Sequence, residues 1–350
     1  GTTGIPKGVV HTERSVAMAS RFLTEIVGVH HDDVFPMAYP FAHIGGPVRL
    51  MASLAAGFCV VLFETFDFER SPKVMGDLGA TLLGSAVPFF LAFLDAQQAH
   101  GSEPMFPRLR FGVAGGAPLP TDVIRRFRDE LGCAGILNAW GLTEFPCATS
   151  VAPTDPLWVM EQTVGRPVSG IEVRVVGSTG EVLPAGTEGE LRLRGPQRFL
   201  GYVDSSLNAT ATDADGFVCT GDLGLVDDGG YVRITGRLKD VIIRNAENIS
   251  ALEIEGVLFS HPSIATVAVI GLPDERKGER CCAVVVLSPP NAQLTLTDIG
   301  EHCRDAGLAP QKIPEQLEIV DALPMNSMGK IIKNELRARF AVSSAPPVAP

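Results

Sequence analysis

The stretch "NAWGLTEF", residues 138–145, places an aromatic ring, a glycine, a hydroxyl and a carboxylate close together after a short apolar run. The Trp140 ring can stack on a base, the Thr143 hydroxyl can bind a phosphate oxygen, and the Glu144 carboxylate can bind Mg²⁺, which prefers oxygen ligands. A tryptophan packed before an ordinary turn explains the same residues. The segments on either side therefore decide between the two interpretations.

Upstream of this stretch, strand-like and helix-like segments alternate from residue 8 to about residue 150. "GVVHT" precedes a helical pattern, "TLLGSAVP" precedes "FFLAFLDAQQ", and "RFGVAGGAP" precedes "TDVIRRFRDEL", for which Thr121 is the expected N-cap. This alternation predicts an α/β fold with a parallel sheet and helices on both of its faces. Ligands on such sheets bind at the carboxyl ends of the strands, where the Gly-rich segments of this chain fall.

Two Gly-rich segments accompany the predicted sheet. "GVAGGAPLP" places Gly115, Gly116 and Ala117 at the turn into a helix, and "GTTGIPKG" at residues 1–8 combines glycines and hydroxyls with Lys7. Such groups bind polyphosphate because glycine lets the backbone approach closely, although the spacing does not match GxxxxGK[ST]. Gly-rich segments are more often ordinary turns, so neither one identifies a function alone.

Downstream of "NAWGLTEF" the pattern changes to short strands, of which "GELRLRG" alternates apolar and charged residues as a half-buried strand does. This region predicts a small barrel or a hairpin sheet, and helices and strands mix again after it in a compact α+β unit. The final "SSAPPVAP" is typical of a disordered tail. We expect an α/β part at 1–163, a β-barrel-like subdomain at 164–238, an α+β domain at 239–341 and a tail at 342–350.

Three later segments contain charged residues beside glycines. "TGDLG" and "GRLKD" place Asp222 and Arg237 on neighbouring hairpins, where both could bind ribose hydroxyls or could simply form a surface ion pair. "PMNSMGKIIKNELR" places Lys330 at a turn before a helix. A lysine in that position is usually solvated, because the helix dipole disfavours a cation there, so a nearby anion is the alternative that a function would require.

Composition excludes several classes of protein. A net charge of −11 argues against a general nucleic-acid or anionic-membrane surface. Seven cysteines without a CxxC pair are typical of reduced thiols in a cytoplasm, and the adjacent Cys281 and Cys282 should point to opposite faces of a strand. The longest apolar run, Leu50–Phe63, is too short to span a bilayer and predicts a buried helix followed by a strand.

Taken in order, these motifs resemble the adenylate-forming superfamily of AMP-binding enzymes, which includes acyl-CoA synthetases, the adenylation domains of peptide synthetases and firefly luciferase. The resemblance extends over residues 1–341. It implies a mixed or parallel sheet subdomain with flanking helices, a small β-barrel subdomain and a mobile C-terminal α+β domain. In relatives the Gly/Thr/Lys loop lies well inside the chain, so we expect this sequence to be a fragment that lacks a first subdomain.

The resemblance implies a nucleotide-binding role for five of the motifs. The first loop would hold the β- and γ-phosphates, the Gly-Gly turn and the aromatic-Gly motif would hold adenine, and the two later hairpins would hold the ribose. The residues so assigned are Thr2, Thr3, Gly4, Lys7, Gly115, Gly116, Ala117, Trp140, Gly141, Asp222 and Arg237.

It also implies catalytic roles. Thr143 would contact the α-phosphate, Glu144 would hold Mg²⁺, and Lys330 would bridge the substrate carboxylate and the α-phosphate. His43, in "PFAHIGG", would be a gate between the acyl pocket and the thiol channel, with an ordinary core histidine as the alternative. Lys239 would lie at the hinge between the large and small domains.

The implied activity is that of an acid–thiol ligase. ATP would convert a carboxylic acid, fatty or otherwise apolar, to acyl-AMP, and CoA would then displace AMP. The acid-pocket candidates are apolar or small, without a counter-charge for an amino-acid ammonium: Phe41, Val87, Gly115 and Ala139. Asn245-Ala246 stands where relatives usually carry Gly-Gly, so a carrier protein remains an alternative acceptor. An inactive nucleotide-binding homologue is the alternative of another class, and nothing in the sequence indicates the oligomeric state.

Overall fold

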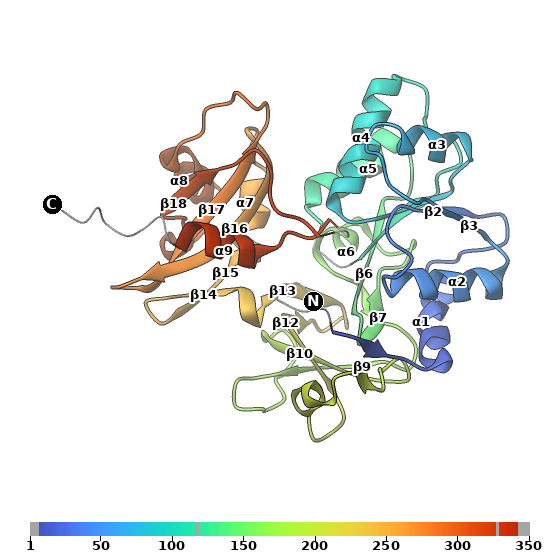
Figure 1. Cartoon of the computed structure of the whole chain (residues 1–350), viewed down its shortest axis with the longest axis horizontal. Helices are drawn as coiled ribbons and strands as arrows, with labels where there is room; N and C mark the ends of the chain where they lie inside the picture. Colours follow the sequence, from blue (N-terminus) through green and yellow to red (C-terminus); the bar gives the residue numbers. More distant parts are fainter. Residues whose placement is uncertain (1–6, 116–118, 327–328, 342–350) are drawn as a thin grey trace.

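The computed structural model describes residues 7–115, 119–326 and 329–341 of the chain. Three regions follow one another along it (Figure 1): an α/β region drawn in blue to green, an antiparallel sheet in yellow-green below it, and an α+β unit in orange and red beside both. The large cleft described below lies where these three regions meet.

The α/β region contains two groups of parallel strands, and the predicted parallel sheet is confirmed. β2 pairs with β3 in parallel, β4, β5 and β6 form a parallel set, and β7 and β8 extend that set in antiparallel orientation. The strands are β1 (Val9–Val10), β2 (Val34–Met37), β3 (Cys59–Leu62), β4 (Leu82–Ser85), β5 (Phe111–Gly115), β6 (Ile136–Leu142), β7 (Phe145–Ser150) and β8 (Arg166–Pro167).

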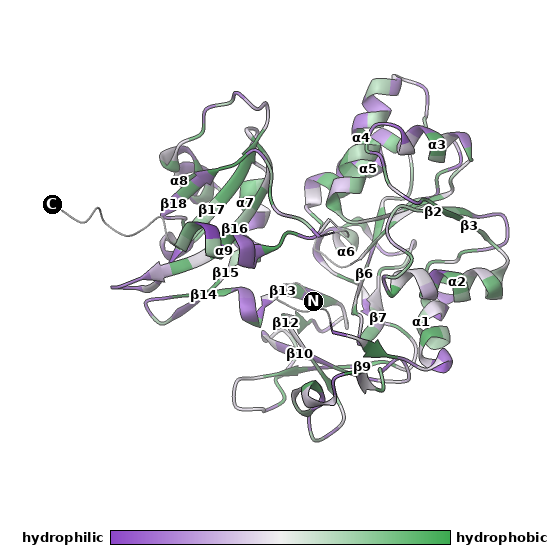
Figure 2. Ribbon diagram, viewed as in Figure 1, coloured by the Kyte–Doolittle hydropathy of each residue, from purple (hydrophilic) through white to green (hydrophobic). Residues whose placement is uncertain are grey.

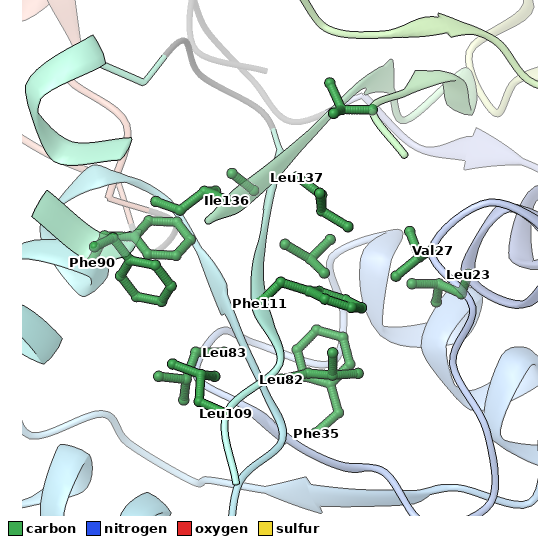
Figure 3. Packing of buried hydrophobic residues seen from close by; sticks show 14 of the residues in the cluster. Leu23, Val27, Phe35, Leu82, Leu83, Phe90, Leu109, Phe111, Ile136 and Leu137 are labelled. Carbon is green, nitrogen blue, oxygen red and sulfur yellow. The ribbon is translucent and has the colours of Figure 1, made fainter. Parts of the chain in front are cut away.

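Helices cover both faces of these strands, as predicted (Figure 1). They are α1 (Glu13–Glu25), α2 (Gly45–Ala56), α3 (Ser71–Asp77), α4 (Val87–His100), α5 (Thr121–Leu131) and α6 (Leu157–Gln162). Figure 3 shows Leu23 of α1 on one side of Phe111 and Phe90 of α4 on the other, within one apolar core. A strand covered on both faces is apolar throughout, which explains the continuous apolar runs of β4 and β5. The expected N-cap Thr121 is wrong by one position, because Pro120 is the N-cap and α5 begins at Thr121.

The second region is an open sheet of four antiparallel strands in the order β13-β12-β10-β9. Its strands are β9 (Glu172–Val176), β10 (Gly189–Arg194), β12 (Val218–Val226) and β13 (Val232–Arg237). Leu191 and Leu193 are fully buried, as their alternation with charged residues predicts. The order leaves β13 and β9 at separate edges, so within the described residues this is a hairpin sheet and not the closed barrel. β11 (Gly201–Tyr202), followed by the 3₁₀ turn η1 (Ser205–Thr210), pairs instead with β1.

The third region begins after the 3₁₀ turn η2 (Leu238–Asp240) and folds around β17. Cys281 packs with Ile254 and Ile299 on one face of this strand, and Cys282 packs with Leu336 on the other, which confirms their predicted opposite orientation. Its elements are β14 (Val241–Arg244), β15 (Glu247–Ser250), α7 (Ala251–Phe259), β16 (Ile264–Asp274), β17 (Gly278–Leu287), α8 (Leu296–Asp305), η3 (Pro310–Lys312), β18 (Gln316–Ile319) and α9 (Lys333–Ala341).

Hydropathy follows this layering, with one exception. Figure 2 shows hydrophobic residues along β16 and β17 and hydrophilic stretches in α9. The run Leu50–Phe63 does form a helix end and a strand, but the expectation of a buried helix is wrong, because Leu50 is 44% exposed and Leu54 is 74% exposed. Across the described ranges, we find no helix with both the length and the apolar character that a bilayer crossing needs.

Candidate active site

A cleft of about 1750 Å³ separates the α/β region from the α+β unit. Residues from all three regions line it, so motifs that are far apart in the sequence lie near one another there. The predicted site residues among those that line the cleft are Trp140, Gly141, Asp222, Arg237, Lys239 and Lys330. Of the acid-pocket candidates, Val87 and Ala139 line the cleft and Phe41 and Gly115 do not.

Trp140, Asp222 and Arg237 form one hydrogen-bonded group, which we call the paired network. The indole Nε1–H of Trp140 donates to Asp222 Oδ2 at 2.8 Å, and Arg237 Nε lies 2.7 Å from Asp222 Oδ1. β12 and β13 place Asp222 directly opposite Arg237, and Asp222 is only 3% exposed. A buried carboxylate has to be paired, and this one is paired on both oxygens. The pair is therefore not a surface ion pair, while Trp140 is both packed and part of the cleft wall.

Lys330 faces the same group from the α+β unit. It follows Gly329, whose φ of 73° suits glycine, in a turn closed by the Gly329 N–H donating to the Asn326 carbonyl at 2.9 Å. Partial burial lowers the pKa of Lys330, the charges of Arg237 and Lys239 lower it further, and Asp222 partly offsets the shift. A cation held near other cations is stabilised by an anion, so this turn is suited to an anionic substrate.

His43 lies close enough to Lys330 for the charge of Lys330 to affect the pKa of His43. Burial and the Lys330 charge lower the pKa of His43 to about 4, so its imidazole is neutral near pH 7. The backbone N–H of Gly45 donates to His43 Nδ1 at 3.1 Å. Because Nδ1 accepts that hydrogen bond, the ring proton is on Nε2, and His43 can donate a hydrogen bond from that atom.

Thr143 and Glu144 form the turn between β6 and β7 and are not part of the paired network. The Tyr202 hydroxyl donates to Glu144 Oε1 at 2.5 Å, and the His11 Nε2 lies 2.6 Å from the Thr143 carbonyl oxygen. Lys7 Nζ lies 5.1 Å from the centre of the Tyr202 ring. The sequence motifs assigned no role to Tyr202 or His11. The "GY" at residues 201–202, downstream of "GELRLRG", was the available signal for Tyr202.

The surroundings of Glu144 fit a magnesium ion that arrives with phosphate. The Tyr202 hydroxyl occupies Oε1, and burial and the Glu144 charge both raise the pKa of that hydroxyl. Mg²⁺ is usually held by one or two carboxylates with phosphate oxygens and water completing the shell. Within the described ranges, the metal-ligating side chains that cluster in a group of three are His30, His31 and Asp32, all exposed.

Among the described predicted site residues, those that do not line the cleft are Lys7, His43, Gly115, Thr143 and Glu144. Thr2, Thr3 and Gly4, and likewise Gly116 and Ala117, lie outside the described residues. Gly115 ends β5, where an added Cβ would lie 3.4 Å from the Ala139 carbonyl oxygen. At Gly141 an added Cβ would lie 2.3 Å from the Pro146 carbonyl oxygen, so the β6–β7 hairpin requires glycine there.

The predicted hinge residue Lys239 is in η2, between β13 of the sheet and β14 of the α+β unit. Burial and the neighbouring Arg237 lower the pKa of Lys239. The next residue, Asp240, accepts a hydrogen bond from Arg337 at 2.9 Å and so ties η2 to α9. Asn245 and Ala246 turn β14 into β15 with φ values of 51° and 62°, a left-handed conformation that glycine would adopt without strain.

Comparison with known proteins agrees with this geometry. The family model for AMP-binding enzymes matches residues 1–203, and the model for the C-terminal domain of AMP-binding enzymes matches residues 253–330. The chain belongs to the AMP-binding enzyme family, within the adenylate-forming superfamily, as its motifs predict. The predicted fold class is confirmed with the hairpin sheet in place of the barrel.

Among its relatives, the medium-chain fatty-acid–CoA ligase of Escherichia coli (strain K12) is 34% identical over 96% of this chain and 59% of its own length. The fatty acid–[acyl-carrier-protein] ligase ScoC of Streptomyces coeruleorubidus is 35% identical over 99% of this chain and 67% of its own length. The structure of ATP-bound MatB from Rhodopseudomonas palustris superposes with a TM-score of 0.90 at 32% identity, covering 99% of this chain and 67% of that one. The chain thus spans about three fifths to two thirds of the lengths of these relatives.

Proposed function

We propose that the chain carries the adenylating and thioester-forming site of an AMP-forming acid–thiol ligase. ATP and a carboxylic acid would give acyl-AMP and pyrophosphate, and CoA would then take the acyl group and release AMP. The observation that carries the proposal is the convergence of Lys330 with the paired network at one cleft, because Lys330 comes from a different structural region and has no carboxylate within ion-pair distance among the described residues.

The first step needs no nucleophile from the protein. A carboxylate oxygen bonds to the α-phosphorus while the bond from that phosphorus to the pyrophosphate oxygen breaks. Two anions have to be held together and the growing charge neutralised, which positioned cations and hydrogen-bond donors can do. Lys330 would neutralise the α-phosphate and the carboxylate, the Thr143 hydroxyl would bind the α-phosphate, and Glu144 would hold Mg²⁺. The metal would neutralise phosphate charge.

In the second step the thiolate sulfur bonds to the acyl carbon, AMP leaves with the bonding electrons, and the thiol proton passes to solvent. Lys330 cannot stay bound to the phosphates and also leave room for the incoming thiol. Rotation of the α+β unit about Lys239 would resolve this conflict, because η2 joins that unit to β13. Asn245 and Ala246 would line the thiol path after rotation.

Pyrophosphate exchange tests the first step directly. We expect labelled pyrophosphate to enter ATP only when a suitable acid is present, and we expect Lys330→Ala to abolish that exchange. Lys73→Ala is the matched control, because Lys73 is exposed on α3 and forms an ion pair with the exposed Asp77. Exchange that is absent with every acid would instead support an inactive nucleotide-binding homologue.

AMP release identifies the acceptor. A ligase that uses CoA should release AMP with a dependence on CoA concentration. The relative ScoC is named for an acyl-carrier protein, and the Asn245-Ala246 turn differs from the usual Gly-Gly, so a carrier protein is the second candidate. AMP release that requires a carrier protein and ignores CoA would favour it.

A further inference from the structure

The turn between Asn326 and Lys330, which we call the Lys330 turn, lies against the first residues of α4 in the α/β region. An ideal Cβ built on Gly329 would lie 3.5 Å from Pro88 Cγ, 3.5 Å from Phe89 Cε2 and 3.7 Å from Pro88 Cδ. Carbon atoms at such distances are in van der Waals contact, so the space between this backbone and α4 would just hold a methyl group. We call Pro88 and Phe89 the α4 seat. Pro88, Gly329 and Lys330 all line the cleft, so this approach is part of its wall.

The core of the α/β region holds the α4 seat in place. Phe89 is buried, and its ring lies edge-on to that of Phe66, with 4.8 Å between the ring centres. Phe90 and Phe93 of the same helix are fully buried. Pro88 lies in the first turn of α4, where its fixed φ suits the helix and its missing N–H removes no helical hydrogen bond. Because a close-packed core yields little, the seat is a rigid surface.

The Lys330 turn is closed by hydrogen bonds on both sides of Lys330. The Asn326 N–H donates to the Lys330 carbonyl at 2.9 Å, and Asn326 Oδ1 accepts from the Lys330 N–H at 3.0 Å. The Asn326 carbonyl also accepts from the Gly329 N–H, and Met325 and Ile331 pair in an antiparallel bridge beyond the turn. A displacement of Gly329 therefore moves Lys330 with it.

The same turn is attached to the α+β unit, so the contact with α4 joins two regions. α9 begins three residues after Lys330, and Lys333 Nζ of that helix lies 2.7 Å from Glu255 Oε1 of α7. Glu255 Oε1 also accepts from the Val269 N–H of β16 at 2.7 Å. The turn thus belongs to one region and the seat to the other. The rotation that the proposed function places between its two steps would separate them.

We propose that Pro88 and Phe89 are positioning residues for adenylation. The α4 seat stops the Lys330 turn where the lysine reaches the α-phosphate and the reacting carboxylate. This inference rests on the proposed function and goes beyond it, because it assigns a role in one step to two apolar side chains. Phosphoryl transfer depends on positioning, and a displacement of about 1 Å can cost about 10²-fold in rate. Packing between the two regions that has no effect on the chemistry is the competing explanation.

Separate rates for the two half-reactions test the positioning role. Pro88→Trp fills the methyl-sized space and pushes the turn back, so acyl-AMP formation should fall by about 10²-fold. Pro88→Ala removes the two ring carbons that face Gly329 and should lower the same rate by a smaller factor. The loss should appear in kcat and not in the KM for ATP. Thioester formation from supplied acyl-AMP should be spared in both variants, because the rotated unit no longer contacts the seat.

Two matched variants separate the seat from its helix and from the loss of a proline. Ala99→Trp adds the same side chain at an exposed position of α4, about 16 Å further along the helix axis. Pro72→Ala removes a proline from the first turn of α3, and Pro72 does not line the cleft. Both variants should leave the two half-reactions unchanged. Melting temperatures of all four variants show whether any loss of rate is a loss of folded protein.

Hydrogen–deuterium exchange tests the contact without turnover. The amides of Gly329 and Lys330 are hydrogen-bonded within the turn, so they exchange when the turn opens. Pro88→Trp should speed exchange in the peptide that contains them, because the displaced turn loses its support. Ala99→Trp should not change it.

The outcomes distinguish this inference from the proposed function. Pro88 variants that slow both half-reactions equally, or neither of them, would overturn the positioning role and leave the ligase function. Unchanged amide exchange in Pro88→Trp would overturn the contact itself, whether or not the chain is active. Pyrophosphate exchange that is absent from the unaltered chain with every acid would contradict the ligase function, while faster amide exchange in Pro88→Trp would still support the contact.

Discussion

Two polar groups of the molecule differ in how their buried atoms are paired. In the paired network, Asp222 binds Trp140 through one oxygen and Arg237 through the other. Tyr39, His43 and Arg49 lie around Gly45 and form a second group, which we call the Gly45 cluster. There, Tyr39 Oη and Arg49 Nε have no hydrogen-bond partner among the described residues. The first group is held in shape by its own contacts, whereas the second carries a desolvation cost. The difference separates a group that is held by its own contacts from one whose buried polar atoms the described residues leave unsatisfied.

Lys330 lines the same cleft as the paired network, and its loss should have the largest effect. Lys330→Ala removes the cation that the acid and the α-phosphate would share, so acyl-AMP formation should fall by about 10²–10³-fold. Thioester formation from supplied acyl-AMP should be largely spared. Rates of both half-reactions measure this, and an equal loss in both would contradict a role confined to adenylation.

The hinge decides whether Lys330 can leave the paired network after the first step. Lys239→Pro would fix φ and remove a backbone donor, which should restrict rotation of the α+β unit. One half-reaction should then fall by about 10²-fold, the cost of misplaced reacting groups, while the other persists. Losses of a few-fold in both half-reactions would mean that the unit turns about another residue.

The free energy of unfolding should respond differently in the two groups when one member is removed. Asp222→Ala leaves the Trp140 N–H and Arg237 without their partner and should lower the free energy of unfolding by about 2 kcal/mol. Tyr39→Phe removes a hydroxyl that has no hydrogen-bond partner in the described parts of the chain, and it should leave that free energy nearly unchanged. Urea denaturation of both variants measures this difference. Similar losses in the free energy of unfolding would contradict it.

His43 should add a pH dependence that belongs to the Gly45 cluster. Its pKa in the folded chain is about 4, below the ordinary value of 6.5, so in this window the unfolded chain binds a proton that the folded chain does not. The free energy of unfolding should therefore fall as the pH is lowered through this range, and His43→Gln should show a weaker dependence. An NMR titration of His43 with a midpoint near its ordinary value would refute this, and Lys330→Ala should raise the midpoint.

The order of short motifs was sufficient to predict the family and the α/β core, and the candidate residues Trp140, Asp222 and Lys330 line one cleft. Each of those motifs is local in sequence and contains the residue types that its implied role requires. The Glu144–Tyr202 contact was not predicted, because no motif assigned a role to Tyr202. The missing partner of Arg49 was even less accessible, since a sequence does not indicate which charges remain unpaired after folding.

Two structural expectations failed for simpler reasons. Alternation along "GELRLRG" identifies a strand with one buried face, but it does not say whether the sheet closes, and β13 and β9 remain separate edges. Apolar residues are frequently exposed, so the run that contains Leu54 and Leu62 could not be placed in the core from its composition alone.

The adjacent thiols of β17 give this chain a built-in pair of reporters. Cys281 and Cys282 are each fully buried, one beneath α7 and α8 and the other beneath α9. An alkylating reagent added to the native protein can reach either sulfur only when the helix above it detaches, so mass spectrometry of the modified peptide counts two opening events separately. Since α9 begins three residues after Lys330, the modification rate of Cys282 would report how often the helix that follows the proposed catalytic lysine detaches from β17.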